Sequence, residues 1–419
     1  MRAGRRFSVL AVLLVCSLWL TGCRSRQEVP VSITLIHSWG GTEPDHAVMR
    51  SIYEGFQKKY PKIRLQMISM PGGEEMLRKV EDMIMVGNVP DVVNFSGIGK
   101  NATYEFMINN HMAVDLAPFI KENSLFRDSL SQSNLRYWTT AEGELYSIAD
   151  VLTLSGGYWY NETVFKEAGI SELPKTWDEF LAMCERIRSW ADTQGRSVRP
   201  LQPSAEGYLY LLDHMLGERT IGKQPFFSAD LKKQLTGIFA QAAPESQDYS
   251  YRDETSLFNE GRLGIYINGV WGAQMIGSHV QARYALFPAH DKVATACEST
   301  ALGYVVGKSG DERKEAAAKL FLEYMVSEEV QTRILQETEQ IPANPHISPE
   351  VFRNQKPRLY QAATTVLGAK QKLEIPDNYW SAEEKLLLME KLLPTLSGES
   401  SWQQLEDALS KNGVQQPVP

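Results

Sequence analysis

The sequence predicts an α/β fold built around a largely parallel sheet, and three observations lead to this prediction. Strand-like and helix-like segments alternate along the first part of the chain. The composition, 43% hydrophobic and 22% charged residues, is ordinary for a globular protein. Without its first 22 residues the 419-residue chain still has about 397, more than one hydrophobic core usually covers, which favours two domains.

The first five elements are expected in the order strand, helix, strand, helix, strand. The first helix repeats apolar residues every four positions, at Val48, Ile52 and Phe56, and Pro44 suits its first turn. Alternation of this kind is typical of a parallel sheet with crossover helices. The expected spans are 31–37, 44–59, 63–68, 74–86 and a third strand that starts near Pro90.

Later helices are predicted from their capping residues. Thr176 with Glu179, and Ser381 with Glu384, match the capping-box spacing. Asp311 opens a long amphipathic helix. The last helix carries Trp402, Leu405 and Leu409 on one face and is expected to end at Gly413. These helices are interpreted as scaffold, and Trp177 as a core residue.

The N-terminus predicts export. Three arginines precede an apolar run over residues 7–20, which is typical of a secretory signal and too short to span a bilayer as a helix. The segment Leu20-Thr21-Gly22-Cys23 resembles the bacterial lipobox, which is cut before the cysteine that then carries lipid. We therefore expect a lipoprotein signal peptide over 1–22 and a lipidated tether over 23–30. The alternative is a simple signal peptide with an incidental cysteine.

Charge and cysteine content narrow the function classes. The chain carries a formal charge of −8; residues 1–22 hold three arginines and no acid, so the remainder is at about −11. Such an acidic protein is a poor candidate for binding nucleic acid. Cys184 and Cys297 could pair outside the cytoplasm, but Cys184 falls on the apolar face of a predicted helix and is expected to be buried. No cysteine or histidine spacing indicates a metal site.

No motif requires catalysis or a cofactor. The segment GIGKN at 97–101 lacks the spacing of a phosphate loop, and neither GxSxG nor HExxH occurs. The 51 acidic residues leave a glycosidase carboxylate pair open, although abundant acids usually form a solvated surface. We expect no enzyme, no cofactor and no metal.

Aromatic residues near strand ends and turns are the most informative feature. In an open α/β sheet, ligands bind outside the carboxyl ends of the strands. Aromatic rings beside small residues suit the flat C–H-rich face of a sugar. Tyr158 and Tyr210 are interpreted as core, whereas Trp39 and Trp271, which are flanked by glycines, favour a ligand. The aromatics concerned are Trp39, Phe95, Tyr158, Trp159, Tyr160, Tyr208, Tyr210, Trp271 and Trp380.

A set of segments stands in a recognisable order along the chain after the signal. The segments are WGG at Trp39–Gly41, F-x-x-x-YPKI at 56–63, PDVV at 90–93, YWYNETVFKEAGI at 158–170, PKTWDEF at 174–180, FNEGRLGIYINGVW at 258–271, the long helical segment at 302–331, IPANP at 341–345 and SWQQLEDAL at 401–409. This ordered set resembles the extracellular solute-binding proteins of ABC importers, in the group that includes the maltodextrin-binding proteins. The resemblance covers nearly the whole chain after the signal, and no single segment is decisive.

The resemblance implies a two-lobe periplasmic-binding-protein-like fold with a central cleft and hinge crossings. Lobe one would comprise 31–149 plus 310–371, and lobe two 150–307 plus 372–419. The crossings would lie near Asp150, Gly307 and Lys372. Lobe closure would be a population shift driven by contacts made only in the closed form, which the membrane permease then reads.

The resemblance also implies a set of carbohydrate-binding residues. Trp271 and Trp380 match two tryptophans that stack on sugar in relatives. Four regions supply the others. They are the turn after the first strand (Trp39, Gly40, Gly41 and Glu43), the turn after PDVV (Phe95 and Ser96), a hinge acid (Asp150) and the region in which relatives hydrogen-bond sugar hydroxyls (Glu206 and Tyr208). The protein would act as a monomer, anchored through Cys23 to the extracytoplasmic face of a bacterial cell membrane.

Two departures weaken a specific maltodextrin assignment. The segment YSIADVL lacks a proline common in the family, and FSGIGK lacks an acidic residue that some oligosaccharide binders carry. A polyamine or a phosphate ester remains an alternative ligand, although no basic cluster lies near the aromatics to hold a phosphate. A surface glycoside hydrolase is the alternative of another class, and a sensory role is compatible with all of these.

Overall fold

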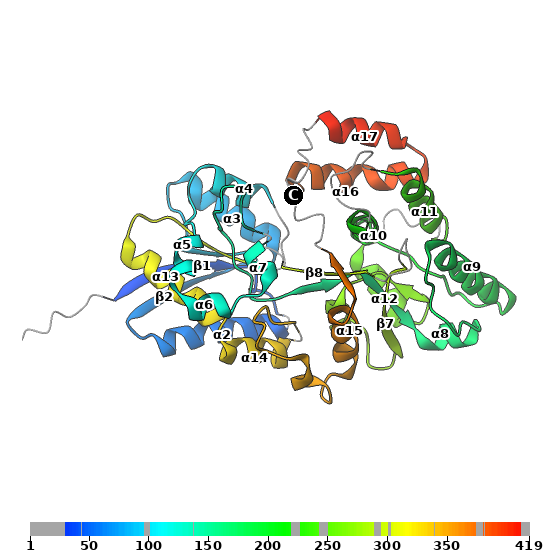
Figure 1. Cartoon of the computed structure of the whole chain (residues 1–419), viewed down its shortest axis with the longest axis horizontal. Helices are drawn as coiled ribbons and strands as arrows, with labels where there is room; N and C mark the ends of the chain where they lie inside the picture. Colours follow the sequence, from blue (N-terminus) through cyan, green and yellow to red (C-terminus); the bar gives the residue numbers. More distant parts are fainter. Residues whose placement is uncertain are drawn as a thin grey trace, which may run out of the picture.

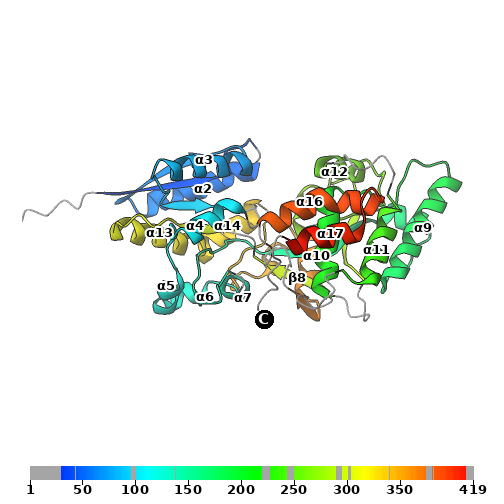
Figure 2. The ribbon, with the colours of Figure 1, turned by 90° about the horizontal axis from the view of Figure 1, so that it is seen from above.

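The computed structural model describes residues 30–42, 44–95, 101–136, 138–218, 227–242, 250–288, 295–300, 303–338, 340–373, 380 and 382–411. Its elements form two lobes joined by a narrow waist, which Figures 1 and 2 show from two directions. The predicted signal peptide, Cys23 and nearly all of the tether lie outside the described residues. The same holds for Glu43, Ser96, Ser381 and Gly413.

Lobe one is built on a four-stranded sheet in the order β2-β1-β3-β9. Strand β1 (Val31–His37) pairs in parallel with β2 (Ile63–Ser69) and with β3 (Val92–Asn94), which confirms the predicted parallel pattern. Strand β9 (Tyr304–Val306) returns from much later in the chain and pairs antiparallel with β3. The inward residues of β1 and the predicted stripe on α2 (Pro44–Lys59) meet in one buried core.

Helices cover both faces of this sheet, as the alternating pattern predicts. The two long helices that follow β9 pack on the same core as the N-terminal helices, so the sheet is completed by two distant parts of the chain. Besides α2, the helices of lobe one are α3 (Gly73–Met85), α4 (Ala102–Asn109), α5 (Ala117–Glu122), α6 (Ser124–Asp128), α7 (Gln132–Arg136), α13 (Glu312–Met325) and α14 (Glu328–Thr338).

Lobe two contains a second sheet, in the order β6-β5-β7, with both neighbours antiparallel to β5. Its strands are β5 (Gly157–Asn161), β6 (Ile265–Tyr266) and β7 (Ala282–Leu286). Its helices are α8 (Glu162–Glu167), α9 (Trp177–Thr193), α10 (Ala205–Glu218), α11 (Ala229–Phe239), α12 (Tyr251–Asn259), α15 (Pro357–Leu367), α16 (Ala382–Ser397) and α17 (Trp402–Lys411), with short 3-10 helices η2 (Val270–Gln274) and η3 (Pro349–Phe352).

Three crossings connect the lobes, and backbone hydrogen bonds hold them side by side. The first leads from lobe one into β4 (Thr153–Ser155), the second joins β8 (Thr295–Ser299) to β9, and the third follows α14. A third sheet of order β10-β8-β4 flanks them, with β10 at Gln371–Leu373. The bonds run from Tyr304 N–H to Ile148 O (2.7 Å), from Leu152 N–H to Ile341 O (2.7 Å) and from Ala343 N–H to Asp150 O (3.0 Å).

The expected third crossing near Lys372 is wrong. Helices α13 and α14 belong to lobe one as expected, but the remainder of 310–371, from η3 onward, belongs to lobe two. Helix α15 packs on β7 and η2 of lobe two. Its Gln361 side chain accepts from the N–H of Tyr284 and donates to the carbonyl of Tyr284, both at 2.9 Å. The chain therefore returns to lobe two about 30 residues earlier than expected, between α14 and η3. The first crossing contains Asp150, as expected, whereas Gly307 bridges to Ala113 inside lobe one.

The predicted caps are mostly confirmed where they can be seen. The Thr176 hydroxyl accepts from the N–H of Glu179 (3.2 Å), while the Glu179 carboxylate accepts from the N–H of Lys175 (2.7 Å) instead of completing the box at Thr176. Asp311 caps α13 through the N–H of Arg313 (2.9 Å). Trp177 is buried, as predicted.

Two further expectations concern cysteines and membrane helices. Cys184 and Cys297 are both buried, and no disulfide joins them. Within the described ranges, none of the helices combines the length and apolar character needed to cross a bilayer. The same residues contain no group of three or more potential metal ligands.

Candidate functional site

The turn after β1 is fixed by its own backbone. The N–H of Trp39 donates to Nδ1 of His37 (3.1 Å), and the N–H of Gly40 donates to the carbonyl of Met70 (2.7 Å). A side chain at residue 40 would place its Cβ only 2.6 Å from that carbonyl oxygen, so this close approach requires glycine. The turn thus lies against the end of β2, at the carboxyl ends of the parallel strands.

Helix α2 holds the same turn from the other side. The N–H of Gly41 donates to Nδ1 of His46 (3.0 Å), and the guanidinium of Arg50 donates to the carbonyls of Gly41 (3.0 Å) and Trp39. The Trp39 ring meets the His46 ring edge-on, with centroids 5.1 Å apart. These contacts preorganise the turn, although Trp39 itself is only 9% exposed and forms part of the lobe-one core.

The end of β3 lies beside the second crossing. Phe95 is fully buried, its N–H donates to the carbonyl of Gly303 (2.8 Å), and its ring packs edge-on against Tyr104. Ser96, the next predicted contact, lies outside the described residues. Phe95 therefore anchors the point where the chain leaves the sheet, and its ring takes part in the core.

Asp150 stands at the first crossing and begins a buried hydrogen-bonded chain. The Tyr304 hydroxyl donates to Asp150 Oδ2 (2.7 Å), the Tyr53 hydroxyl lies 3.1 Å from that of Tyr304, and the Asn94 amide donates to Tyr53 (2.7 Å). Burial raises the pKa of the Tyr304 hydroxyl and Asp150 raises it further, so the phenol stays protonated and can donate. Asp150, at 1% exposed, thus links the hinge to the end of β3.

Trp271 lies in η2, directly after β6, and remains partly exposed. Its ring folds back over Gly269 so closely that a Cβ there would lie 2.0 Å from Cζ3 of the indole. The carbonyl of Gly269 accepts from Nε1 of Trp159 (2.9 Å), which ties the turn to the lobe-two sheet. Glycine at 269 is what lets the Trp271 ring take this position.

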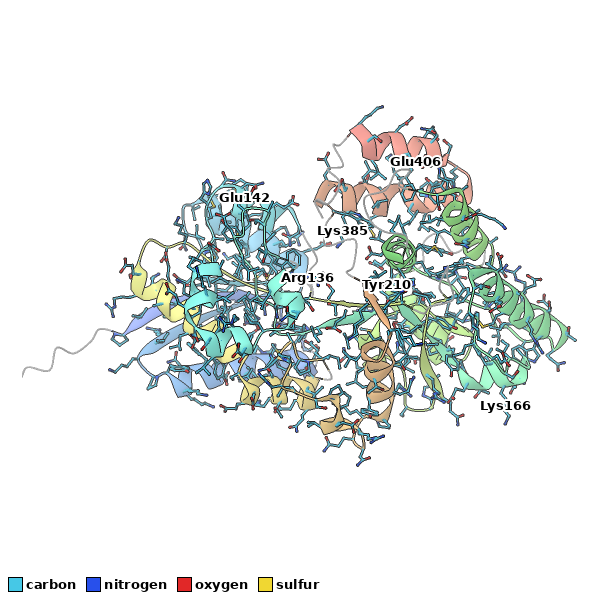
Figure 3. The ribbon with its side chains drawn as sticks, in the orientation of Figure 1. Arg136, Glu142, Lys166, Tyr210, Lys385 and Glu406 are labelled. Carbon is cyan, nitrogen blue, oxygen red and sulfur yellow. The ribbon has the colours of Figure 1, made fainter. Side chains whose placement is uncertain are left out.

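Tyr210 makes a corner with Trp271. The two rings meet at 87° with centroids 6.2 Å apart, and the Tyr210 hydroxyl accepts from the N–H of Gly156 (2.9 Å). Tyr210 is partly exposed and lies on the side of lobe two that faces lobe one, across from Arg136 of α7 (Figure 3). The interpretation of Tyr210 as purely core is corrected by this exposure, whereas Tyr158 is fully buried as expected.

The other predicted residues of lobe two lie apart from this corner or inside the core. Tyr208 is 1% exposed and packs against Phe239, on the opposite side of α10 from Tyr210. Glu206 is exposed in the first turn of α10. Trp380 is 6% exposed within the lobe-two core. Of the two predicted stacking tryptophans, only Trp271 presents a partly exposed ring.

The candidate site therefore has two parts, one on each lobe. It combines a fixed backbone turn on lobe one with an aromatic corner on lobe two. His46, Arg50 and Tyr210 belong to it although the sequence reasoning did not select them as site residues. The sequence indicates Tyr210 as a possible contact because it lies in the aromatic stretch around Tyr208. No sequence pattern indicates His46 or Arg50.

The family comparison is consistent with this geometry. A profile of the family described as bacterial extracellular solute-binding protein matches residues 39–332, from the turn after β1 to α14. The multiple sugar-binding protein of Streptococcus mutans is 26% identical over 208 residues, which are 46% of this chain and 43% of that protein. The chain thus matches less than half the length of this curated relative.

Solved structures share the whole architecture. A Streptococcus pneumoniae solute-binding protein in complex with the blood group A-trisaccharide superposes with a TM-score of 0.76 at 20% identity, over 91% of this chain and 99% of that one. A chitin oligosaccharide binding protein gives a TM-score of 0.72 at 18% identity, over 91% of this chain and 98% of that one. At these identities the likeness shows the two-lobe fold and confirms that prediction.

Proposed function

The chain belongs to the bacterial extracellular solute-binding proteins, and on that premise we propose that it captures a mono- or oligosaccharide between its lobes and delivers it to the permease of an ABC importer. The observation that carries the sugar assignment is the partly exposed Trp271 ring, held over Gly269 and walled by Tyr210. Such a corner offers two flat apolar faces to the C–H surface of a sugar ring. The names of the similar proteins point to the same ligand class.

Delivery requires closure, and the crossings suit it. The three crossings are short and bonded laterally, so they can act together as one hinge while the lobe cores stay rigid. Away from the hinge, α16 of lobe two reaches α4 of lobe one, which Figure 2 shows from above. We propose that sugar bound to both lobes favours the closed form and that the permease recognises this form.

Two alternatives are less well supported. A polyamine or phosphate ester would fit the same fold, but the aromatic corner favours a ring with apolar faces. A glycoside hydrolase would need two acids placed about a sugar, and the family consists of binding proteins. We propose that the protein binds its ligand without turnover, which a chromogenic glycoside assay would check.

A thermal-shift screen of the chain from Arg24 onward is expected to identify the ligand class. A ligand that binds only the folded state adds about 2.7 kcal/mol at a hundred times its dissociation constant. For lobes of this size, that is a rise of several degrees in Tm. The panel contains monosaccharides, blood group A-trisaccharide, chitin oligosaccharides, polyamines and phosphate esters.

The outcomes separate the proposals. A shift with one sugar class supports carbohydrate capture and names the substrate. A shift with polyamines alone keeps the solute-binding role and contradicts the sugar. No shift with any compound contradicts the small-molecule assignment and directs attention to a macromolecular ligand.

The family places the protein outside the cytoplasm, and we propose further that Cys23 carries a lipid anchor. The sequence at 20–23 supports this through its resemblance to a lipobox. Labelled fatty acid is expected to enter the wild-type protein in bacterial cells and to be absent from Cys23→Ala, because the thioether is the attachment point. Equal labelling of the two would contradict lipidation, and Cys184→Ala, which removes a buried thiol, serves as the matched control.

A further inference from the structure

Glu254 carries a fully buried carboxyl group on α12, and two backbone N–H groups donate to it. Its Oε1 accepts from the N–H of Ile267 (3.1 Å), and its Oε2 accepts from the N–H of Ser204 (3.2 Å). Burial raises the pKa of this carboxyl to about 8, and the two N–H groups act against that rise. A buried carboxyl is costly to keep unless its hydrogen bonds are made, so these two contacts stabilise it in the core.

The N–H of Ser204 links Glu254 to the start of α10. Ser204 precedes this helix, its hydroxyl accepts from the N–H of Gly207 (3.2 Å), and its carbonyl accepts from the N–H of Tyr208 (3.0 Å). Ser204 is therefore the cap on which the first turn is built. Tyr210 lies in the next turn of the same helix, so holding Ser204 holds Tyr210.

The N–H of Ile267 links Glu254 to the turn that carries Trp271. Ile267 ends the extended segment after β6, and the next residue, Asn268, accepts from the N–H of Gly269 through its side chain (2.8 Å). Trp271 follows two residues later, with its ring over Gly269. Holding Ile267 therefore holds the backbone on which the Trp271 ring rests.

We infer that Glu254 is a positioning residue that clamps the start of α10 to the end of β6 and thereby holds Tyr210 and Trp271 in one aromatic corner. Each carboxyl oxygen accepts from one of the two segments, so both are held at a fixed separation. The corner geometry is independent of the ligand. That the corner stacks on sugar rests on the proposed function.

The first test needs no ligand. The chain from Arg24 onward, labelled with 5-fluorotryptophan, contains eight reporters, because the ninth tryptophan, Trp19, lies in the predicted signal peptide. The Trp271 resonance is assigned from its loss in Trp271→Phe. In Glu254→Gln one oxygen becomes an amide NH₂ that faces an N–H donor, so one side of the clamp opens. We expect the ¹⁹F resonances of Trp271 and of Trp159, which binds Gly269, to shift, while Trp39 and Trp138 of lobe one stay in place.

The matched control is Asp91→Asn in lobe one. Asp91 is also buried, at 4% exposed, and its Oδ2 accepts from the N–H of Thr34 (2.8 Å). This variant loses a buried carboxylate without touching the corner and is expected to leave Trp271 unshifted. Glu254→Asp keeps the carboxyl group but shortens the reach, and it serves if Glu254→Gln fails to fold. An unchanged Trp271 resonance in a folded Glu254 variant overturns the inference.

The second test uses whichever sugar of the panel stabilises the wild type. We expect Glu254→Gln to weaken its binding about tenfold, and to weaken binding less than twofold further in a Trp271→Ala background. A merely structural role would instead lower affinity by the same factor in both backgrounds, which would overturn the link to binding. If no sugar binds, the proposed function fails, while the fluorine test still decides whether Glu254 positions the corner.

Discussion

Replacing Trp271 with alanine is expected to weaken sugar binding at least tenfold while the protein still folds. The ring is partly exposed in η2, so its removal leaves the buried lobe-two core in place. Tenfold corresponds to only about 1.4 kcal/mol, which is near the upper end of a single aromatic contact, about 1.5 kcal/mol beyond burial. Calorimetric titration with the sugar found by the thermal-shift screen measures the loss, and unfolding of the ligand-free protein checks the fold.

Gly269→Ala is expected to have a similar effect with the tryptophan still present. The new Cβ would lie 2.0 Å from Cζ3 of Trp271, which is too close for two non-bonded carbon atoms, so the ring must move away. If the position of the ring matters for binding, displacing it costs affinity much as deleting it does. Combining both substitutions should then cost little more than Trp271→Ala alone, because the two act on one contact.

Trp190→Ala is the matched control for the loss of an indole. Trp190 is also a partly buried tryptophan of lobe two, but it lies on α9, at the end of the lobe remote from the waist (Figure 1). Its replacement is expected to lower stability and to leave sugar affinity within twofold. Unchanged affinity in Trp271→Ala would show that Trp271 is a packing residue and would remove the main support for a sugar ligand.

The elements of lobe one were predictable because local signals and tertiary demands agree there. Strand β1 starts and ends at the predicted residues, and α2 does so as well, between Pro44 and the turn at Pro61. The apolar residues of α2 repeat every four positions, and the structure buries Ile52 and Phe56. Pattern and fold point the same way in this region.

The lobe boundary was not predictable, because it depends on where a single amphipathic helix docks. Helix α15 has an apolar face that would suit either lobe. Its place on lobe two is decided by Gln361 against Tyr284 and by Arg358, which donates to the carbonyl of Val280 (2.8 Å). These partners lie about 80 residues away in sequence, so no local pattern indicates them.

The candidate site was predicted only in part, for a similar reason. Tyr208 and Tyr210 are two residues apart, which on a helix is a turn of about 200°, so only one of them can face the waist. Apolar residues surround both in the sequence, and the helix shows no polar face there that would say which. Glu254 was missed because its partners are backbone N–H groups, which every residue except proline carries.

Replacing His214 with leucine is expected to protect the protein against mild acid. His214 is 2% exposed on α10, its ring lies 5.0 Å from that of Phe287, and neither ring nitrogen has a hydrogen-bond partner among the described residues. Burial lowers its pKa from 6.5 to about 4, so the folded protein holds it neutral. In the unfolded chain the His214 ring binds a proton near pH 6.5, whereas in the folded chain it is protonated only as the pH approaches 4.

The sign of the effect follows from this difference. With respect to His214 alone, the free energy of unfolding is highest above pH 6.5 and falls as the pH drops toward 4, because the unfolded state then binds the extra proton. At pH 5 the loss from one such histidine is about 2 kcal/mol, which for a domain of 150–250 residues is about 4–8 °C in Tm. His37 is also buried with a pKa lowered to about 4, so wild type loses stability through both rings. Glu254, with its raised pKa, acts in the opposite direction, losing stability as the pH rises.

The Tm of wild type and of His214→Leu is therefore measured at pH 7 and at pH 5. The fall in Tm between the two pH values is then compared between the two proteins, and the difference isolates the effect of His214. Leucine buries no unpartnered polar atom, so His214→Leu is expected to be at least as stable as wild type at pH 7. Between pH 7 and 5 its Tm should fall less than that of wild type, with the loss through His37 still present. His279→Leu, which removes an exposed ring of the same lobe, should follow the wild-type curve. Parallel acid losses in wild type and His214→Leu would show that the buried ring accepts its proton without unfolding, through water that reaches it in the folded state.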